Sequence, residues 1–251
     1  MIKRIAGLAG MTVASILATN CIAPPPAAQC PCSSTTSATS ASTSASTTNA
    51  DTSTAKSSSA TSAPPAVKPT AALIADGKSN TLINIDPPGS WFVLNDRTAK
   101  GTMVPSSTGD FPAALTKAGT IHTSGKGFTD WGGGIGFNFV GADSLTPLDA
   151  STYSGITFKA SGTQPVHVGL ATKATMPEFG DCTKCYDHYA VDITDLSPTP
   201  KTYTFKWSQL RAGGWGAPKA ALDPHLLVGL NFTSKGATPW DFTLDDIAFT
   251  P

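Results

Sequence analysis

The stretch YSGITFKA, residues 153–160, indicates the fold class most directly. It is short, rich in β-branched and aromatic residues, and bounded by turn-forming residues, as a β-strand is. Similar runs follow at residues 166–171, 203–207, 226–233 and 240–249, with weaker candidates at Ile121 and residues 134–140. Only residues 208–212 and 217–221 look helical. Many short strands and no long amphipathic helix predict an all-β, antiparallel β-sandwich.

The N-terminal residues 1–20 resemble an export signal. Lys3 and Arg4 precede an apolar run, residues 5–17, that is too short to span a membrane comfortably. Cys21 follows directly, as in a bacterial lipoprotein signal, where this cysteine is lipid-modified and becomes the new N-terminus; Asn20 stands where Gly or Ala is usual. The alternative is cleavage near Ala18 and release. We therefore expect an exported protein, either a lipoprotein of the outer membrane or cell surface anchored through Cys21, or a secreted protein.

Residues 21–66 have the composition of a disordered linker. They are Pro-rich at first, and residues 33–66 are almost entirely Ser, Thr and Ala. Such a segment has too few apolar side chains to offset its ordering entropy. The folded domain is predicted at residues 69–251, long enough for a single core, and we expect it to be a monomer. Cys30 and Cys32 fall in the linker, and the sequence assigns them no role.

Composition and motifs argue against two classes of function. Formal net charge is zero and the charged fraction is 14%, so nothing points to nucleic-acid binding. The sequence contains no nucleophile elbow, no phosphate-binding loop and no His-Glu-x-x-His helix. Asp96, Asp130 and Asp187 could be combined as glycosidase carboxylates, but nothing in the sequence pairs them. The prediction is a protein that is not an enzyme.

The segment DCTKCYDHY, residues 181–189, gathers more reactive side chains than its surroundings. Three interpretations stay open. In an exported protein Cys182 and Cys185 would close a small disulfide loop next to His188. A zinc site would need a further ligand, such as His122 or His167. A redox pair would need a helix in an α/β setting, which the pattern does not indicate. We predict the disulfide.

The domain resembles the galactose-binding-domain-like jelly rolls that occur as carbohydrate-binding modules beside bacterial glycosidases. The resemblance is carried by WFVLND (residues 91–96), HTSG (122–125) with WGGG (131–134), YSGITFKA (153–160) and FTLDDIAF (242–249). The Cys-x-x-Cys-Tyr-Asp-His segment and GWG (214–216) are similar to features of a branch found in secreted bacterial proteins. The resemblance implies a jelly-roll sandwich that binds a polysaccharide or a cell-surface glycan.

The resemblance also implies a structural calcium ion. Such modules often open with an acidic pair and a glutamate that help to bind it, but here the corresponding stretch is NIDPP, residues 84–88, without glutamate. Asp245 matches the other half of the site, and Asp86 could add an oxygen. Calcium requires several oxygen ligands, so the alternative is that Asp245 and Asp246 only cap a sheet edge.

Tryptophans are the main candidates for sugar contact, because their faces stack on the C–H patches of pyranose rings. Trp131 and Trp215 are flanked by glycines in apparent loops and are predicted to face the ligand; Trp207 and Trp240 are predicted to lie in the core. The other predicted ligand-binding residues are Tyr186, Asp187 and His188, with Trp91 and Asp96 at the edge, and His122. His167, between two valines, is expected to face solvent.

The sequence thus predicts a non-catalytic, surface-anchored module that binds polysaccharide. One alternative is a structural or adhesive surface domain without a small ligand. A further alternative is a metal-dependent or glycoside-processing enzyme.

Overall fold

A computed structural model describes residues 65–251, apart from 117, 143–145, 217–219 and 237. The predicted export signal, the predicted lipidation site Cys21 and nearly all of the predicted linker, with Cys30 and Cys32, lie outside the described residues. Backbone pairing begins at Val67, whose N–H donates to the Pro147 carbonyl at 3.1 Å. Within the described part of the chain, no helix is long and apolar enough to cross a membrane.

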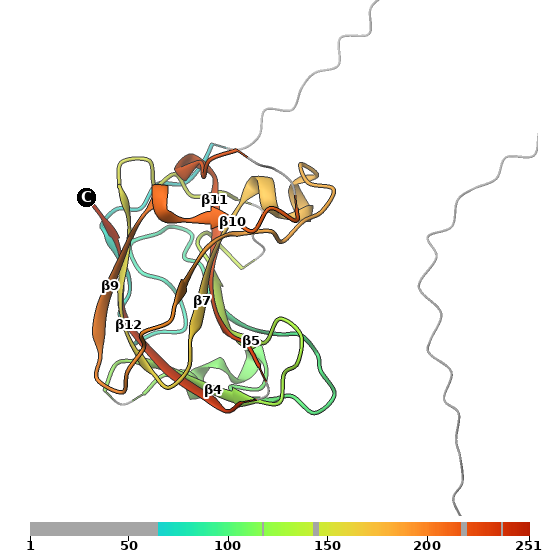
Figure 1. Cartoon of the computed structure of the whole chain (residues 1–251). Helices are drawn as coiled ribbons and strands as arrows, with labels where there is room; N and C mark the ends of the chain where they lie inside the picture. The colour runs from blue at the N-terminus through green and yellow to red at the C-terminus, as the bar shows by residue number, and fades with distance from the viewer. Residues whose placement is uncertain (1–64, 117, 143–145, 217–219, 237) are drawn as a thin grey trace, which may run out of the picture. The chain divides into compact units, whose positions relative to one another are not determined.

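Two antiparallel sheets form the domain (Figure 1). Sheet A has the strand order β10 (Arg211–Ala212), β8 (Tyr189–Ile193), β7 (Val166–Thr172), β11 (Leu227–Ser234), β5 (Gly133–Asn138) and β2 (Trp91–Asn95). Sheet B has the order β3 (Thr102–Val104), β4 (Ile121–Lys126), β12 (Trp240–Thr250), β6 (Gly155–Gly162) and β9 (Lys201–Lys206), and β1 (Leu73–Ala75) also pairs with β12. The chain passes repeatedly between the sheets, which confirms the predicted jelly-roll sandwich.

The connections carry short 3₁₀ turns and no α-helix in the described ranges. These turns are η1 (Thr108–Ala114), η2 (Lys173–Thr175), η3 (Pro177–Phe179), η4 (Trp207–Gln209) and η5 (Pro224–Leu226). The helix expected at residues 208–212 is therefore wrong. That short run forms the end of η4 and then β10, which pairs with β8, because sheet pairing outweighs a weak local helix preference.

Aromatic side chains fill the space between the two sheets. Phe158 of β6 meets Phe232 of β11 edge to face at 5.1 Å between ring centroids, an arrangement that aromatic pairs favour. Along β11 the inward residues Leu230 and Phe232 are buried, and the alternate residue Asn231 points to the other face. The same two-residue period operates in each strand, so sheet A presents a separate outer face on which a site can be built.

The predicted core tryptophans are confirmed. Trp240 is buried, and Trp207 packs against the core with its indole N–H donating to the Tyr153 carbonyl at 2.8 Å. Trp91 also lies in the core, where it stacks on Phe111 at 5.2 Å. Its predicted position at the edge of the ligand site is therefore wrong: the alternation of β2 turns Trp91 inward and its neighbours Phe92 and Leu94 outward.

Candidate functional site

A cleft of about 980 Å³ lies on the outer face of sheet A. Its floor follows the strand register: Phe92, Gly136, Asn231 and Gly169 lie side by side on β2, β5, β11 and β7. Two groups of loops stand on the same side of the sheet (Figure 1), residues 173–188 and 213–216 in gold and orange and residues 96–101 and 127–132 in green. Two of these four floor positions are glycine, and the walls of the cleft are loops.

Exposed aromatic side chains gather at this cleft. Four large hydrophobic residues are exposed in the described part of the chain: Trp131, Tyr186 and Trp215, at 45%, 57% and 59%, and Val104. All except Val104 line the cleft. Trp131 precedes β5 and Trp215 follows β10, so four strand spacings, roughly 19 Å, separate the two ends of the cleft across the sheet.

Asp187 holds the loop that carries Trp215. It is 3% exposed, and its carboxylate accepts the backbone N–H groups of Gly213 at 2.7 Å, Gly214 at 2.9 Å and Gly216 at 2.8 Å. At Gly216 a Cβ atom would collide with the Asp187 side chain, so glycine is required there for the loop to approach the carboxylate. Asp187 lines the cleft as predicted, but both of its oxygens bind backbone, so it positions Trp215.

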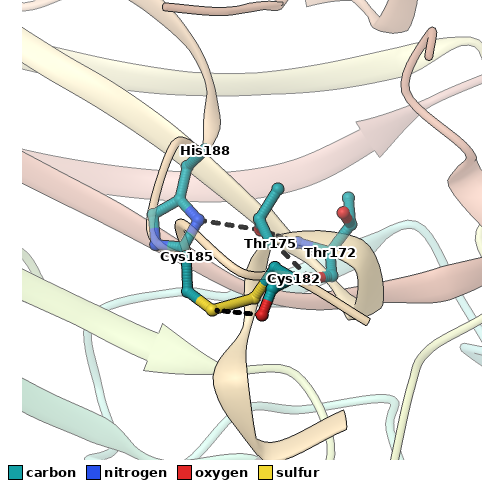
Figure 2. The surroundings of a disulfide bond; sticks show 5 residues. All are labelled: Thr172, Thr175, Cys182, Cys185 and His188. Carbon is teal, nitrogen blue, oxygen red and sulfur yellow. Dashed lines mark hydrogen bonds between the residues drawn. A yellow bond between two sulfur atoms is a disulfide. The ribbon is translucent and has the colours of Figure 1, made fainter. Parts of the chain in front are cut away.

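The predicted disulfide is present: Cys182 and Cys185 are bonded at 2.06 Å. Figure 2 shows this loop beside His188, whose Nδ1 lies 2.9 Å from the Thr175 hydroxyl. Tyr186 follows the loop in the left-handed region, with φ 71°, a conformation that costs a non-glycine residue about 1 kcal/mol or more. Its N–H donates to the Thr175 carbonyl at 2.8 Å. The disulfide and Thr175 thus fix the wall that carries Tyr186 and His188.

His188 is neutral at ordinary pH. Burial lowers the pKa of His188 to about 4, and the nearby His167 adds to this effect, while Asp187 opposes it. An uncharged imidazole next to an exposed tyrosine can exchange single hydrogen bonds with hydroxyl groups. Tyr186 and His188 meet edge to face at 6.1 Å between ring centroids.

Asp96 holds the loop that carries Trp131, as Asp187 holds the loop that carries Trp215. Its carboxylate accepts the N–H groups of Thr98 at 2.9 Å, Asp130 at 2.8 Å and Gly132 at 3.1 Å. Burial alone would raise the pKa of Asp96, but these hydrogen bonds outweigh it and hold the pKa below its ordinary value. Asp96 does not line the cleft. Its predicted contact with the ligand is replaced by support of the Trp131 loop.

The polar groups of the floor come from β7, β8 and β11. His167 faces solvent, as predicted, and its Nδ1 lies 2.7 Å from Asp192 Oδ1. Asn231 lies on the next strand, and its Oδ1 is buried above Gly136 with no hydrogen-bond partner among the described residues. Lys235 stands at the rim. These side chains offer hydrogen bonds spread over a mostly apolar surface.

His122 is not part of the cleft. It lies on β4 of sheet B, opposite Thr243 of β12, and its Nε2 is 3.0 Å from Asp241 Oδ2. Because Ile121 and Thr123 point into the core, His122 faces outward on the layer opposite to the cleft. The structure therefore does not bring His122 together with the other predicted ligand-binding residues.

The metal hypotheses receive no geometric support. No group of three or more His, Cys, Asp or Glu side chains that could hold a metal ion occurs in the described part of the chain. The disulfide occupies both thiols that zinc would need. Asp245 Oδ1 accepts the Asp246 N–H at 2.8 Å, and two carboxylates, Asp86 and Asp245, would supply a minority of the six to eight oxygens of calcium. The described side chains do not fit such a site, and structural calcium stays a prediction.

Several residues that line the cleft were not predicted from the sequence, among them Phe92, Leu94, Asp192 and Asn231. For Asn231 a signal existed, because a polar residue alternates with Leu230 and Phe232 in a predicted strand. For Phe92 the signal was ambiguous. Side chains alternate along a strand, so Trp91 and Phe92 must face opposite sides of the sheet, but the strand alone does not show which of them faces the core.

No protein-family model and no curated protein matches the sequence significantly. Among solved structures, the chain is similar to a family 11 carbohydrate-binding module from Clostridium thermocellum in complex with a β-1,3-1,4-mixed-linked tetrasaccharide. Sequence identity is 17% and the TM-score 0.46, over 71% of this chain and 94% of that chain. The family 11 module of a cellulosomal cellulase from the same organism is 18% identical with a TM-score of 0.46, over 70% of this chain and 92% of that chain. The N-terminal cellulose-binding domain of Cellulomonas fimi β-1,4-glucanase C is 15% identical with a TM-score of 0.30, over 63% of this chain and 86% of that chain.

Proposed function

We propose that this protein binds an uncharged polysaccharide in the cleft of sheet A. The observation that carries the proposal is the convergence of Trp131, Tyr186 and Trp215, three of the four exposed large hydrophobic side chains among the described residues, on one cleft. Exposed aromatic side chains in one concave surface mark a binding site. A pyranose ring pairs well with them, since it has apolar C–H faces and hydroxyl groups at its edge.

The charges of the cleft favour an uncharged ligand. His167 and Asp192 pair with each other, His188 is neutral, and Asp187 is occupied by backbone N–H groups. Lys235 is the one lining cation without an ion-pair partner among the described residues. A polyanion such as a uronic-acid polymer or a nucleic acid would require a cluster of Lys and Arg.

The same residues argue for binding without catalysis. A glycosidase needs two free carboxyl groups, one with a raised pKa. Asp187 and Asp192 are the only carboxylates among the described residues of the cleft. Asp187 accepts three backbone N–H groups, and Asp192 pairs with His167, so both carboxylates already interact with other groups of the protein.

We also propose a location for the protein from its N-terminal sequence. An export signal, Cys21 as a lipid anchor and the Ser/Thr/Ala-rich linker would place the domain at a cell surface as a monomer. A disulfide between Cys182 and Cys185 fits an oxidising compartment. A linker of this composition would let the cleft reach polysaccharide beyond the membrane.

Affinity electrophoresis of the full-length protein through soluble hydroxyethylcellulose, xylan, glucomannan and polygalacturonate tests the proposal. We expect retardation by a neutral polymer and none by polygalacturonate. Trp131→Ala and Trp215→Ala should each weaken binding at least tenfold, about 1.4 kcal/mol, because each removes a stacking surface. Val104→Ala is the matched control, since Val104 is as exposed as the tryptophans but lies outside the cleft.

Absence of binding to every neutral polymer would overturn the proposal and favour a structural or adhesive domain. Equal weakening by Val104→Ala and by the tryptophan variants would also count against the cleft. Release of reducing sugar from any of these polymers would contradict the non-catalytic assignment.

A further inference from the structure

Gly169 occupies the middle of the cleft floor, on a central strand where glycine is unfavourable. It lies on β7 between Asn231 of β11 and Ala190 of β8. Glycine inside a strand costs about 0.5–1 kcal/mol relative to alanine. Its presence usually has one of three reasons: a positive φ, close approach of another part of the protein, or close approach of a ligand.

The first two reasons do not apply to Gly169. It is absent from the glycines with positive φ. A Cβ atom added to Gly169 would have as its nearest neighbours His188 Cβ at 3.8 Å and His167 Nε2 at 3.9 Å, which are ordinary contact distances. The fold therefore has room for a side chain here.

Other glycines of the same sheet show what a structural requirement looks like. A Cβ atom at Gly229 would lie 2.6 Å from the Phe137 carbonyl oxygen, at Gly134 it would collide with the Phe232 carbonyl, and at Gly136 with Asn231 Oδ1. These glycines are required by neighbouring atoms. Gly169 differs, because the space above it belongs to the cleft.

We infer that Gly169 is the specificity-determining position of the cleft, where the face of a saccharide ring rests directly on the strand backbone. The inference rests on the proposed function and adds the location of a central subsite. His167 stands beside this subsite: its Nδ1 lies 2.7 Å from Asp192 Oδ1, and its Nε2, next to Gly169, is left for a hydrogen bond with a hydroxyl group. Asn231 flanks the subsite on the other side. The subsite thus combines a flat floor with polar groups at its edges.

The test is a graded series, Gly169→Ala and Gly169→Val, in the full-length protein. Binding to soluble hydroxyethylcellulose, xylan and glucomannan is measured by affinity electrophoresis and, for the polymer bound most tightly, by titration calorimetry. We expect affinity to fall severalfold for Gly169→Ala and at least tenfold for Gly169→Val, while Tm is equal to or higher than that of the wild type. Gly109→Val is the control, because Gly109 is exposed on η1, a Cβ atom there would meet only Ser107 Oγ, at an ordinary contact distance of 3.8 Å, and Gly109 lies outside the cleft.

Lost affinity at unchanged or higher Tm supports the inference, because substitution of a glycine that the fold requires would lower Tm. Wild-type affinity within twofold in Gly169→Val overturns it and leaves the proposed function intact. A lower Tm in Gly169→Ala also overturns it, since glycine would then be required by the fold. If the wild type binds none of the three polymers, the proposed function fails first and the inference fails with it.

Discussion

Replacement of Asp187 tests whether the cleft depends on a buried carboxylate that does not itself touch the ligand. Asp187→Asn keeps the size of the side chain but removes the charge, and it turns one acceptor oxygen into an N–H₂ group. The three backbone N–H groups of Gly213, Gly214 and Gly216 now converge on that carboxylate. In the variant at least one of them would face another donor.

The expected loss of stability follows from these contacts. A hydrogen bond to a charged group contributes about 1.5–3 kcal/mol. Asp187 is 3% exposed, so water replaces the lost acceptor only if the Gly213–Gly216 loop opens. Because the three bonds are not additive, we expect a total loss of about 3 kcal/mol for Asp187→Asn. For a domain of this size, about 3 kcal/mol lowers Tm by roughly 6–12 °C.

Thermal denaturation and affinity electrophoresis on the same samples separate the possible roles of Asp187. We expect lower Tm together with weaker polysaccharide binding, because the opened loop no longer holds Trp215. Asp110→Asn is the control: its carboxylate accepts only the hydroxyls of Ser106 and Ser107 in the exposed η1 region, and Tm and binding should stay unchanged. Unchanged Tm with lost binding would refute the positioning role and restore direct ligand contact. Unchanged Tm and binding would refute both.

Two groups predict how stability depends on pH, in separate windows. The pKa of His188 falls from 6.5 to about 4 on folding. The free energy of unfolding should therefore be constant above pH 6.5 and fall by about 3 kcal/mol as the pH decreases to 4, because the unfolded chain binds this proton first. Denaturant unfolding of His188→Gln should lack this slope, and a slope identical to the wild type would contradict the assignment. Burial would raise the pKa of Asp149, but hydrogen bonds from Ser151 and the cations Lys68 and His225 lower it to about 2. Asp149→Asn should therefore cost about 2 kcal/mol at pH 7 and much less at pH 2, where about half of the folded protein has lost this charge. An equal cost at both pH values would rule out the charge as its cause.

The sheets were predictable from sequence because their strands are short, apolar and separated by turn-forming residues. The predicted runs at residues 166–171, 226–233 and 240–249 match β7, β11 and β12 within one residue. Other strands were missed, such as β8, YAVDI, which follows the disulfide loop without a clear turn signal. Strand order was beyond reach, since β11 pairs with β5 and β7, and those partners are distant along the chain.

The aromatic walls of the cleft were also predictable, because glycines next to Trp131 and Trp215 leave a large side chain without neighbours to pack against. The floor was not. Phe92, His167, Asp192 and Asn231 come together only through the register of β2, β7, β8 and β11, and register depends on pairing between distant segments. His122 was misplaced for the same reason, since its strand belongs to sheet B.

Asp187 was predicted as a ligand contact together with its neighbours Tyr186 and His188, and Asp96 together with Trp91 at the edge of the site. In the structure both carboxylates bind the backbone of loops that carry exposed tryptophans. A tryptophan that must stay exposed for binding cannot be fixed by packing, since packing would cover it. Its loop therefore has to be fixed by hydrogen bonds, and a carboxylate that accepts backbone N–H groups does this at both Trp131 and Trp215. A loop fixed in advance loses less entropy when the ligand binds. Under the proposed function, the aspartates would thus contribute to affinity by ordering the loops, one layer behind the surface that would contact the polysaccharide.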